Sequence, residues 1–165
     1  MSSDHLLGYE FCCTITPGSG AIDQNGHVNV AQFGIMFEEA ATVLMKTLSF
    51  GTRYRRQRRC AYFVRENHLK IYREALEREP LSIYSRIVNA SDSAFEVMMI
   101  MIRDQDLDLI SVQNTLWLNV SLDLRKVVST DRKSLAALKD RIAHQQPCAE
   151  NITLPKWINF RTSAG

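Results

Sequence analysis

The longest regular pattern of apolar residues along the chain lies between residues 30 and 49. Apolar side chains recur there every three or four positions, at Val30, Phe33, Met36, Phe37, Ala40, Ala41, Leu44, Met45 and Leu48. This spacing predicts a helix from residue 30 to residue 49 that ends before Gly51. Asn29 and Gln32 have the spacing of a capping box, and Val28 and Phe33 that of a hydrophobic staple.

This predicted helix carries very little charge. Its only charged residues are Glu38, Glu39 and Lys46. A helix with so few polar positions needs cover on most of its circumference, which one flat layer does not provide. We therefore expect the rest of the chain to wrap around it.

The covering elements are predicted to be strands. Five segments have strand-like patterns, at residues 9–16, 61–72, 81–89, 95–103 and 109–123. The last alternates apolar and polar residues, which predicts a long half-buried strand. Short turns at 77–80, 89–93 and 104–108 predict that neighbouring strands form antiparallel hairpins.

The C-terminal part is predicted to hold a second helix over residues 131–144 and an extended tail over 147–165. Trp157, Ile158 and Phe160 in the tail are expected to pack against the body or a partner. The element order predicts one α+β domain spanning residues 1–165, with a core at about 9–123, a C-terminal part at 124–165 and a sheet curled around one central helix.

Composition narrows the class of protein. The 165 residues are 45% hydrophobic and 23% charged, with a formal net charge of +2. These values exclude a collagen-like or disordered chain and do not favour nucleic acid as a partner. The sequence lacks an apolar stretch long enough to span a membrane and a charged start followed by an apolar run, so we expect a cytoplasmic protein. Cys12, Cys13, Cys60 and Cys148 lack metal-ligand or redox spacing and are interpreted as half-buried or buried thiols.

Candidate chemistry is concentrated in the loop just before the long helix. This loop reads Asp23-Gln24-Asn25-Gly26-His27-Val28-Asn29. By itself it is a turn sequence. Its position adds a second interpretation, because a helix N-terminus presents free N–H groups and a partial positive charge that stabilise a developing oxyanion. A carboxylate, a carboxamide and an imidazole next to it are the parts of an acyl-transfer site.

The same residues carry a family resemblance. Asp23-x-Asn25-Gly26-His27-Val28-Asn29, with Phe37-Glu38-x-Ala40 on the helix and Tyr72-Arg73-x-Ala75 later, resembles the hotdog-fold thioesterases of the 4-hydroxybenzoyl-CoA thioesterase type. The resemblance implies a hotdog domain that acts as a homodimer or homotetramer and hydrolyses acyl-CoA without metal or cofactor. It places the catalytic aspartate at Asp23. The similar motif of plant acyl-carrier-protein thioesterases implies catalytic roles for Asn25 and His27.

The mechanistic hypothesis is that the thioester carbonyl accepts hydrogen bonds from the N–H groups of Val30 and Ala31. Asp23 then attacks the carbonyl carbon directly or activates a water molecule, and the sequence leaves both routes open. Asn25 is expected to orient Asp23 or the water, and His27 to hydrogen-bond the carbonyl or assist the leaving sulfur. Substrate contacts are expected from Asn29, Val30, Ala31, Phe33, Glu38, Arg55 and Arg56.

Several residues have competing interpretations. The basic run from Arg53 to Arg59 is either a solvated loop or a rim that attracts the CoA phosphates through residues such as Arg55 and Arg56. Glu38 or Glu39 has a structural or substrate-orienting role, or a catalytic one.

Glu74 and His68 are candidates to approach a partner subunit's site. The competing functions are a non-catalytic acyl-CoA binding or sensing protein and a hotdog hydratase or dehydratase. Release of free CoA distinguishes a thioesterase from both.

Overall fold

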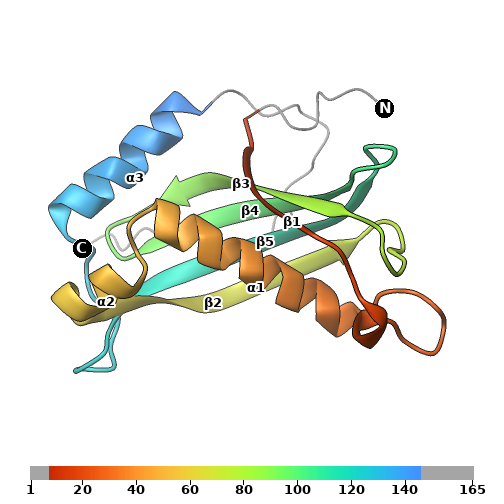
Figure 1. The fold of residues 1–165 in the computed structure, drawn as a ribbon. Coiled ribbons are helices and arrows are strands. Elements are labelled where there is room, and N and C mark those ends of the chain that lie inside the picture. Colours follow the sequence, from red (N-terminus) through yellow and green to blue (C-terminus); the bar gives the residue numbers. More distant parts are fainter. Residues whose placement is uncertain (1–7, 146–165) are drawn as a thin grey trace.

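The computed structural model describes residues 8–145. Figure 1 shows one long helix lying across a single antiparallel sheet, with shorter helices at one end of the molecule. The elements, besides a short 3-10 turn at Ser19–Ala21, are β1 (Glu10–Ile15), α1 (Val30–Thr47), α2 (Thr52–Arg58), β2 (Cys60–Ile71), β3 (Leu81–Ala90), β4 (Ala94–Arg103), β5 (Leu109–Ser121) and α3 (Arg132–His144). All predicted strands and both predicted helices are therefore present, with ends displaced by a few residues at most.

The helix α1 begins and buries its side chains as its sequence predicts. Asn29 is the N-cap, and its side-chain oxygen accepts a hydrogen bond from the Ala31 N–H. Val28 and Phe33 are both buried in the main core. The buried side chains of α1 are those of Phe33, Met36, Phe37, Ala40, Ala41 and Leu44. They cover one face, whereas Val30 and Ile35 are exposed, so within one chain α1 is less fully enclosed than its composition predicts.

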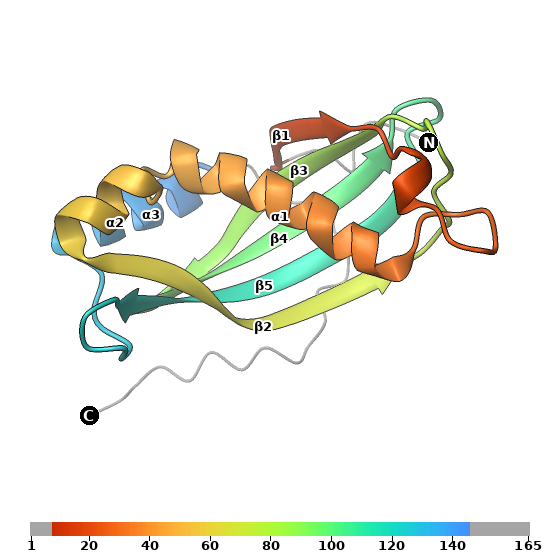
Figure 2. The ribbon, with the colours of Figure 1, turned by 60° about the horizontal axis from the view of Figure 1, so that its bottom comes forward.

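The sheet differs from the predicted series of hairpins at one point. Its strand order is β1-β3-β4-β5-β2. The pairs β3–β4 and β4–β5 are the predicted hairpins, but β2 pairs with β5 instead of β3. The chain crosses from one edge of the sheet to the other after β2, and the short turn between β2 and β3 gave no sign of this. As a result β2 is one open edge of the sheet (Figure 2).

The alternating pattern of β5 also has a different meaning from the one predicted. Directly paired residues of antiparallel strands share a face, and Gln113 and Thr115 pair with Met99 and Val97, which lie in the core beneath α1. The polar positions of β5 therefore face α1, in the interior. They are buried, as are the apolar positions at the centre of the opposite face, so β5 is buried on both sides.

The predicted basic loop is instead a helix. Thr52–Arg58 form α2, for which Gly51 is the N-cap, so Gly51 does not end α1. The residue that ends α1 is Ser49, at φ 62°, with the Phe50 N–H donating to the Met45 carbonyl at 2.8 Å. This is a Schellman ending with serine at the position that usually holds glycine.

Two aromatic residues hold α2 in place. Tyr54 of α2 is buried against Phe50, with ring centroids 5.1 Å apart, and donates a hydrogen bond to the Asn119 Oδ1 at 3.3 Å. Asn119 lies on the same face of β5 as Gln113 and Thr115, so α2 packs on the α1 side of the sheet.

The remaining expectations concern the termini and the thiols. Asp131 caps α3 through the Ser134 N–H. Cys12, Cys13 and Cys60 are free and half-buried, and burial raises the pKa of each thiol. Cys148 and the tail with Trp157, Ile158 and Phe160 lie outside the described residues. Within residues 8–145, no helix combines the length and hydrophobicity needed to cross a membrane.

Candidate functional site

The loop before α1 is a compact turn held by backbone hydrogen bonds. The Asp23 N–H donates to the His27 carbonyl at 2.9 Å, and the Gly26 N–H donates to the Asp23 carbonyl at 3.1 Å. Gly26 has φ 83°, a conformation that glycine adopts without steric cost. The turn interpretation of this sequence is therefore confirmed, and it places the side chains of Asp23 and His27 on one side.

The Asp23 carboxylate is held from two directions. Its Oδ1 accepts a hydrogen bond from the Asn25 backbone N–H at 2.8 Å, and its Oδ2 lies 3.6 Å from the His27 Nδ1. The side chain of Asp23 is 20% exposed and that of His27 is 36% exposed. The carboxylate is thus fixed in position and still accessible to a small molecule.

The start of α1 corrects one part of the mechanistic hypothesis. The Ala31 N–H donates to the Asn29 Oδ1 at 2.9 Å, so it is not available to an oxyanion. The Gln32 N–H donates to the Asn29 carbonyl at 2.9 Å. Among hydrogen bonds between described residues, none uses the Val30 N–H. Val30 is therefore the first-turn donor that remains from the predicted pair.

A pocket of about 320 Å³ joins this turn to the end of β2. Its lining residues are Asp23, His27, Val28, Asn29, Val30, Phe33, Ile71 and Glu74. The structure therefore brings together five of the residues predicted for the site: Asp23, His27, Asn29, Val30 and Phe33.

Sequence reasoning missed Ile71 and assigned Glu74 to a partner's site, whereas Glu74 lines the pocket of its own chain. The contact that brings them there is a hydrogen bond from the Val28 N–H to the Ala75 carbonyl at 2.8 Å. A bond between segments so far apart in sequence leaves no local signal.

Other predicted site residues lie outside this pocket. Asn25 is exposed and holds Asp23 through its backbone N–H, whereas its side chain does not line the pocket. Ala31 and Glu38 are exposed on α1 and do not line it either. His68 pairs with Asn114, which pairs with Met98 on the sheet face turned away from α1, so His68 lies on that outer face.

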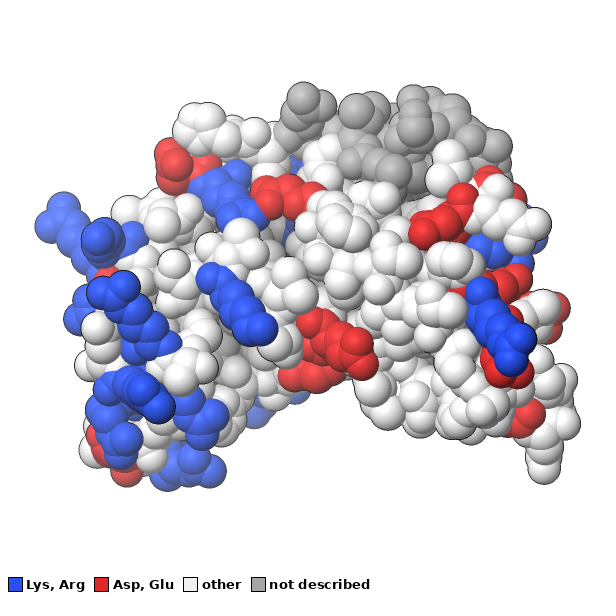
Figure 3. All heavy atoms as spheres, viewed as in Figure 1, with Lys and Arg blue, Asp and Glu red and all other residues white. Residues whose placement is uncertain are grey.

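The basic run is separated from the pocket by the length of α1. The pocket lies at the N-terminus of α1, and α2 follows its C-terminus, about 27 Å away for a helix of this length. Figure 3 shows Lys and Arg side chains crowded at the end of the molecule that carries α2. Within one chain, Arg55 and Arg56 therefore do not form a rim around Asp23.

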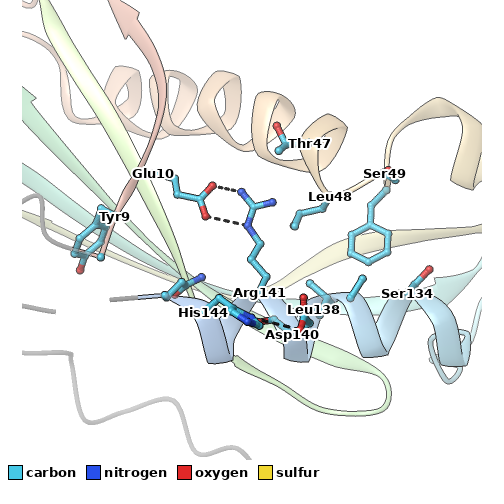
Figure 4. Close-up of a pocket in the computed structure, with 14 residues that line it drawn as sticks. Tyr9, Glu10, Thr47, Leu48, Ser49, Ser134, Leu138, Asp140, Arg141 and His144 are labelled. Atoms are coloured by element: carbon cyan, nitrogen blue, oxygen red, sulfur yellow. Dashed lines mark hydrogen bonds and ion pairs between the residues drawn. The ribbon is translucent and has the colours of Figure 1, made fainter. Parts of the chain in front are cut away.

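A larger cavity, of about 760 Å³, lies at the opposite end of α1 from Asp23. It is bounded by the C-terminus of α1, by α3 and by the start of β1, and an ion pair between Glu10 and Arg141 crosses it (Figure 4). The His144 ring is turned to its own helix, with Nδ1 2.8 Å from the Asp140 carbonyl oxygen. The carboxylate, imidazole and helix N-terminus that acyl transfer requires are absent from this cavity, and they occur together at Asp23.

The residues near Asp23 do not resemble a metal site. Across residues 8–145, no group of three or more His, Cys, Asp or Glu side chains is arranged to hold a metal ion. The chemistry of the pocket therefore has to be derived from its own side chains and from the helix N-terminus.

Comparisons with known proteins agree with this geometry. Residues 17–151 match the family model of the thioesterase-like superfamily. No curated protein matches the sequence.

Among solved structures, a hypothetical protein from Staphylococcus aureus in complex with CoA is 17% identical with a TM-score of 0.77, covering 90% of this chain and 91% of that chain. A DHNA-CoA thioesterase from Staphylococcus aureus is 13% identical with a TM-score of 0.72, covering 82% of this chain and 91% of that chain. A 1,4-dihydroxy-2-naphthoyl-CoA thioesterase from Synechocystis is 16% identical with a TM-score of 0.68, covering 81% and 96%. The family match spans most of the chain, and the protein belongs to the thioesterase-like superfamily as a thioester hydrolase with a hotdog fold.

Proposed function

We propose that the protein hydrolyses an acyl-CoA thioester in the pocket formed by Asp23, His27, Val30, Phe33 and Ile71. The observation that carries this proposal is the position of the Asp23 carboxylate, which is fixed beside the open N-terminus of α1 and lines the same pocket as Val30. A nucleophile or base next to a donor for the oxyanion is the arrangement that acyl transfer requires.

In the proposed mechanism, the thioester carbonyl oxygen accepts a hydrogen bond from the Val30 N–H. The positive end of the α1 dipole then stabilises the charge that develops on this oxygen. Asp23 either attacks the carbonyl carbon, forming a mixed anhydride that water hydrolyses, or takes a proton from a water molecule that attacks instead. In both routes the C–S bond breaks and CoA leaves as a thiolate that takes up a proton.

His27 has a supporting role in this proposal. Its ring lies against Asp23 and is also 3.4 Å from the Val28 carbonyl oxygen. From this position it orients the carboxylate and donates a hydrogen bond to the carbonyl or the leaving sulfur. The apolar side chains of Val28, Phe33 and Ile71 provide contact area for the acyl group next to the reacting carbon.

The CoA part of the substrate has support from a similar fold. The Staphylococcus aureus protein that shares this fold over most of its length was solved with CoA, and two further neighbours are named for CoA thioester hydrolysis. We also propose that the protein acts as a homodimer or a larger homo-oligomer, because the long edge strand β2 lies beside the pocket and unpaired strand edges favour association.

The test is release of free thiol from a panel of short, long, aromatic and polar acyl-CoA substrates. Wild-type protein is expected to release CoA from at least one class, and Asp23→Asn to lower kcat by on the order of 10²–10⁴-fold with an unchanged circular dichroism spectrum. Asp104→Asn, which removes an exposed carboxylate from a turn at the edge of the sheet, is the matched control and should retain wild-type turnover.

Two outcomes contradict the proposal. Binding of acyl-CoA without thiol release would identify a non-catalytic acyl-CoA binding protein. Normal turnover by Asp23→Asn would exclude Asp23 from the mechanism.

A further inference from the structure

The open edge at β2 is suited to self-association. β2 has 12 residues, whereas the other edge strand, β1, has 6 and is tied to α3 by the ion pair between Glu10 and Arg141. β2 leaves Phe63, Val64 and Ile71 exposed by 39%, 46% and 39%. A long edge strand with apolar side chains presents unpaired N–H and C=O groups to any matching strand. The strand that matches its length and pattern is a second copy of β2.

Symmetry fixes the direction of such a pairing. A two-fold axis perpendicular to the sheet continues the sheet into the second copy, and it makes the two β2 strands antiparallel. The start of β2 in one subunit, at Cys60, then lies beside its end in the other, at Ile71. Ile71 lines the pocket that contains Asp23.

The helix α2 immediately precedes Cys60, so the same operation brings α2 of one subunit to the pocket of the other. Tyr54 packs α2 on the face of the sheet that carries α1 (Figure 2), and this axis leaves the helices of both subunits on one side. The basic run that lies one α1 length from Asp23 in its own chain therefore reaches Asp23 across the interface.

The arginines of this run fall into two groups. Arg58 and Arg59 are engaged in their own chain, with Arg58 Nη2 3.5 Å from Asp131 and Arg59 Nη2 2.6 Å from Asp123. Arg53, Arg55 and Arg56 are exposed, and none of them forms an ion pair with a described residue. Three guanidinium groups on one short helix are thus available to a ligand or a neighbouring subunit.

Charge complementarity favours this juxtaposition. The receiving pocket contains the carboxylates of Asp23 and Glu74, and its lining includes no lysine or arginine. A CoA ester carries phosphate groups, and a pocket with only acidic charges repels them. Guanidinium groups supplied by the partner subunit offset that repulsion and bind phosphate in bidentate geometry.

The geometry points to a site shared between two subunits, in which Arg53, Arg55 and Arg56 of one chain bind the phosphate groups of the acyl-CoA whose thioester lies at Asp23 of the other. This inference rests on the proposed function for the identity of the substrate. The dimer and the arginine contribution are tested separately from hydrolysis.

The first experiment compares two triple variants. Arg53→Ala/Arg55→Ala/Arg56→Ala should raise KM for acyl-CoA, and the dissociation constant for CoA in calorimetry, by on the order of 10-fold or more, with kcat retained. Arg132→Ala/Lys133→Ala/Lys139→Ala removes the same charge from the exposed face of α3 and should leave both constants unchanged. Equal effects of the two variants would reduce the role of α2 to general electrostatic attraction and overturn the inference.

The second experiment asks which subunit supplies the arginines. Asp23→Asn and the α2 triple variant are coexpressed with different affinity tags, and the mixed dimer is isolated by two successive purifications. A shared site predicts that one of its two sites has both lesions and the other has neither, so the mixed dimer shows half of the wild-type kcat with the wild-type KM. A site built within one chain predicts that every active site in the mixed dimer retains the raised KM.

The possible failures are distinguishable. Absence of thiol release by the wild-type protein contradicts the proposed function, whereas CoA binding still reports on the arginines. A raised KM in the mixed dimer, or a monomer in sedimentation at assay concentration, overturns the shared site and leaves thioester hydrolysis at Asp23 intact.

Discussion

The Asp23 carboxylate and the His27 imidazole face each other across one turn, with Oδ2 3.6 Å from Nδ1. The turn that joins them is closed by the hydrogen bond from the Asp23 N–H to the His27 carbonyl. Both residues are therefore positioned by the backbone of the same short segment. Their relative placement does not depend on distant packing, which explains how a sequence motif alone identified them.

This pairing predicts a measurable role for His27. His27→Ala should lower kcat by on the order of 10²-fold, because Asp23 loses the neighbour that orients it and the substrate loses a donor. His27→Gln, which retains a side-chain donor, should fall between the alanine variant and the wild type. The measurement is steady-state thiol release, and a wild-type kcat in His27→Ala would contradict the role.

The cap of α1 predicts a stability effect. Asn29→Ala should lower the free energy of unfolding by about 1 kcal/mol, because the Ala31 N–H loses its acceptor. Asn29→Asp keeps an acceptor beside the positive end of the helix and should retain wild-type stability. Urea unfolding at equilibrium checks both variants, and equal stabilities for Asn29→Ala and the wild type would show that the cap is dispensable.

The end of α1 predicts a stabilising substitution. Ser49 adopts φ 62°, where a side chain has a steric cost that glycine avoids. Ser49→Gly should raise the free energy of unfolding by about 0.5–1 kcal/mol after allowing for the greater freedom of glycine in the unfolded chain. Ser49→Ala retains the steric cost and is the control, so a gain from alanine equal to that from glycine would refute this explanation.

The outer face of the sheet predicts a pH dependence of stability. Burial raises the pKa of Glu96 above its ordinary value, against the effect of the hydrogen bond that Asn114 donates, and the charge of Glu66 raises it further. The folded protein therefore holds a proton that the unfolded chain has released, and stability falls as pH rises from the ordinary value through the raised one.

Glu96→Gln removes this titration and keeps an acceptor for Asn114. The variant should be more stable than wild type at pH 7, with the difference disappearing below about pH 4. Denaturant unfolding at several pH values checks this, with Glu77→Gln at an exposed position as the control. A constant difference between Glu96→Gln and wild type across this range would refute it.

Much of the site was predictable because its parts are local in sequence. The cap at Asn29, the turn from Asp23 to His27 and the buried face of α1 depend on spacing within a few residues. Ala31 was wrongly predicted as an oxyanion donor for a local reason as well. The same asparagine that marks the start of the helix binds the Ala31 N–H, so the two predictions were incompatible.

The sequence by itself determined the helix, the strands and the chemistry of the turn, because hydrophobic periodicity and turn preferences act over short distances. Tertiary structure decided which strands pair, which face of β5 meets α1, and that Ile71 and Glu74 join Asp23. It also separated the α2 arginines from Asp23 within one chain. These relationships depend on hydrogen bonds and packing between residues far apart in the chain, and the pattern of any single segment leaves them undetermined.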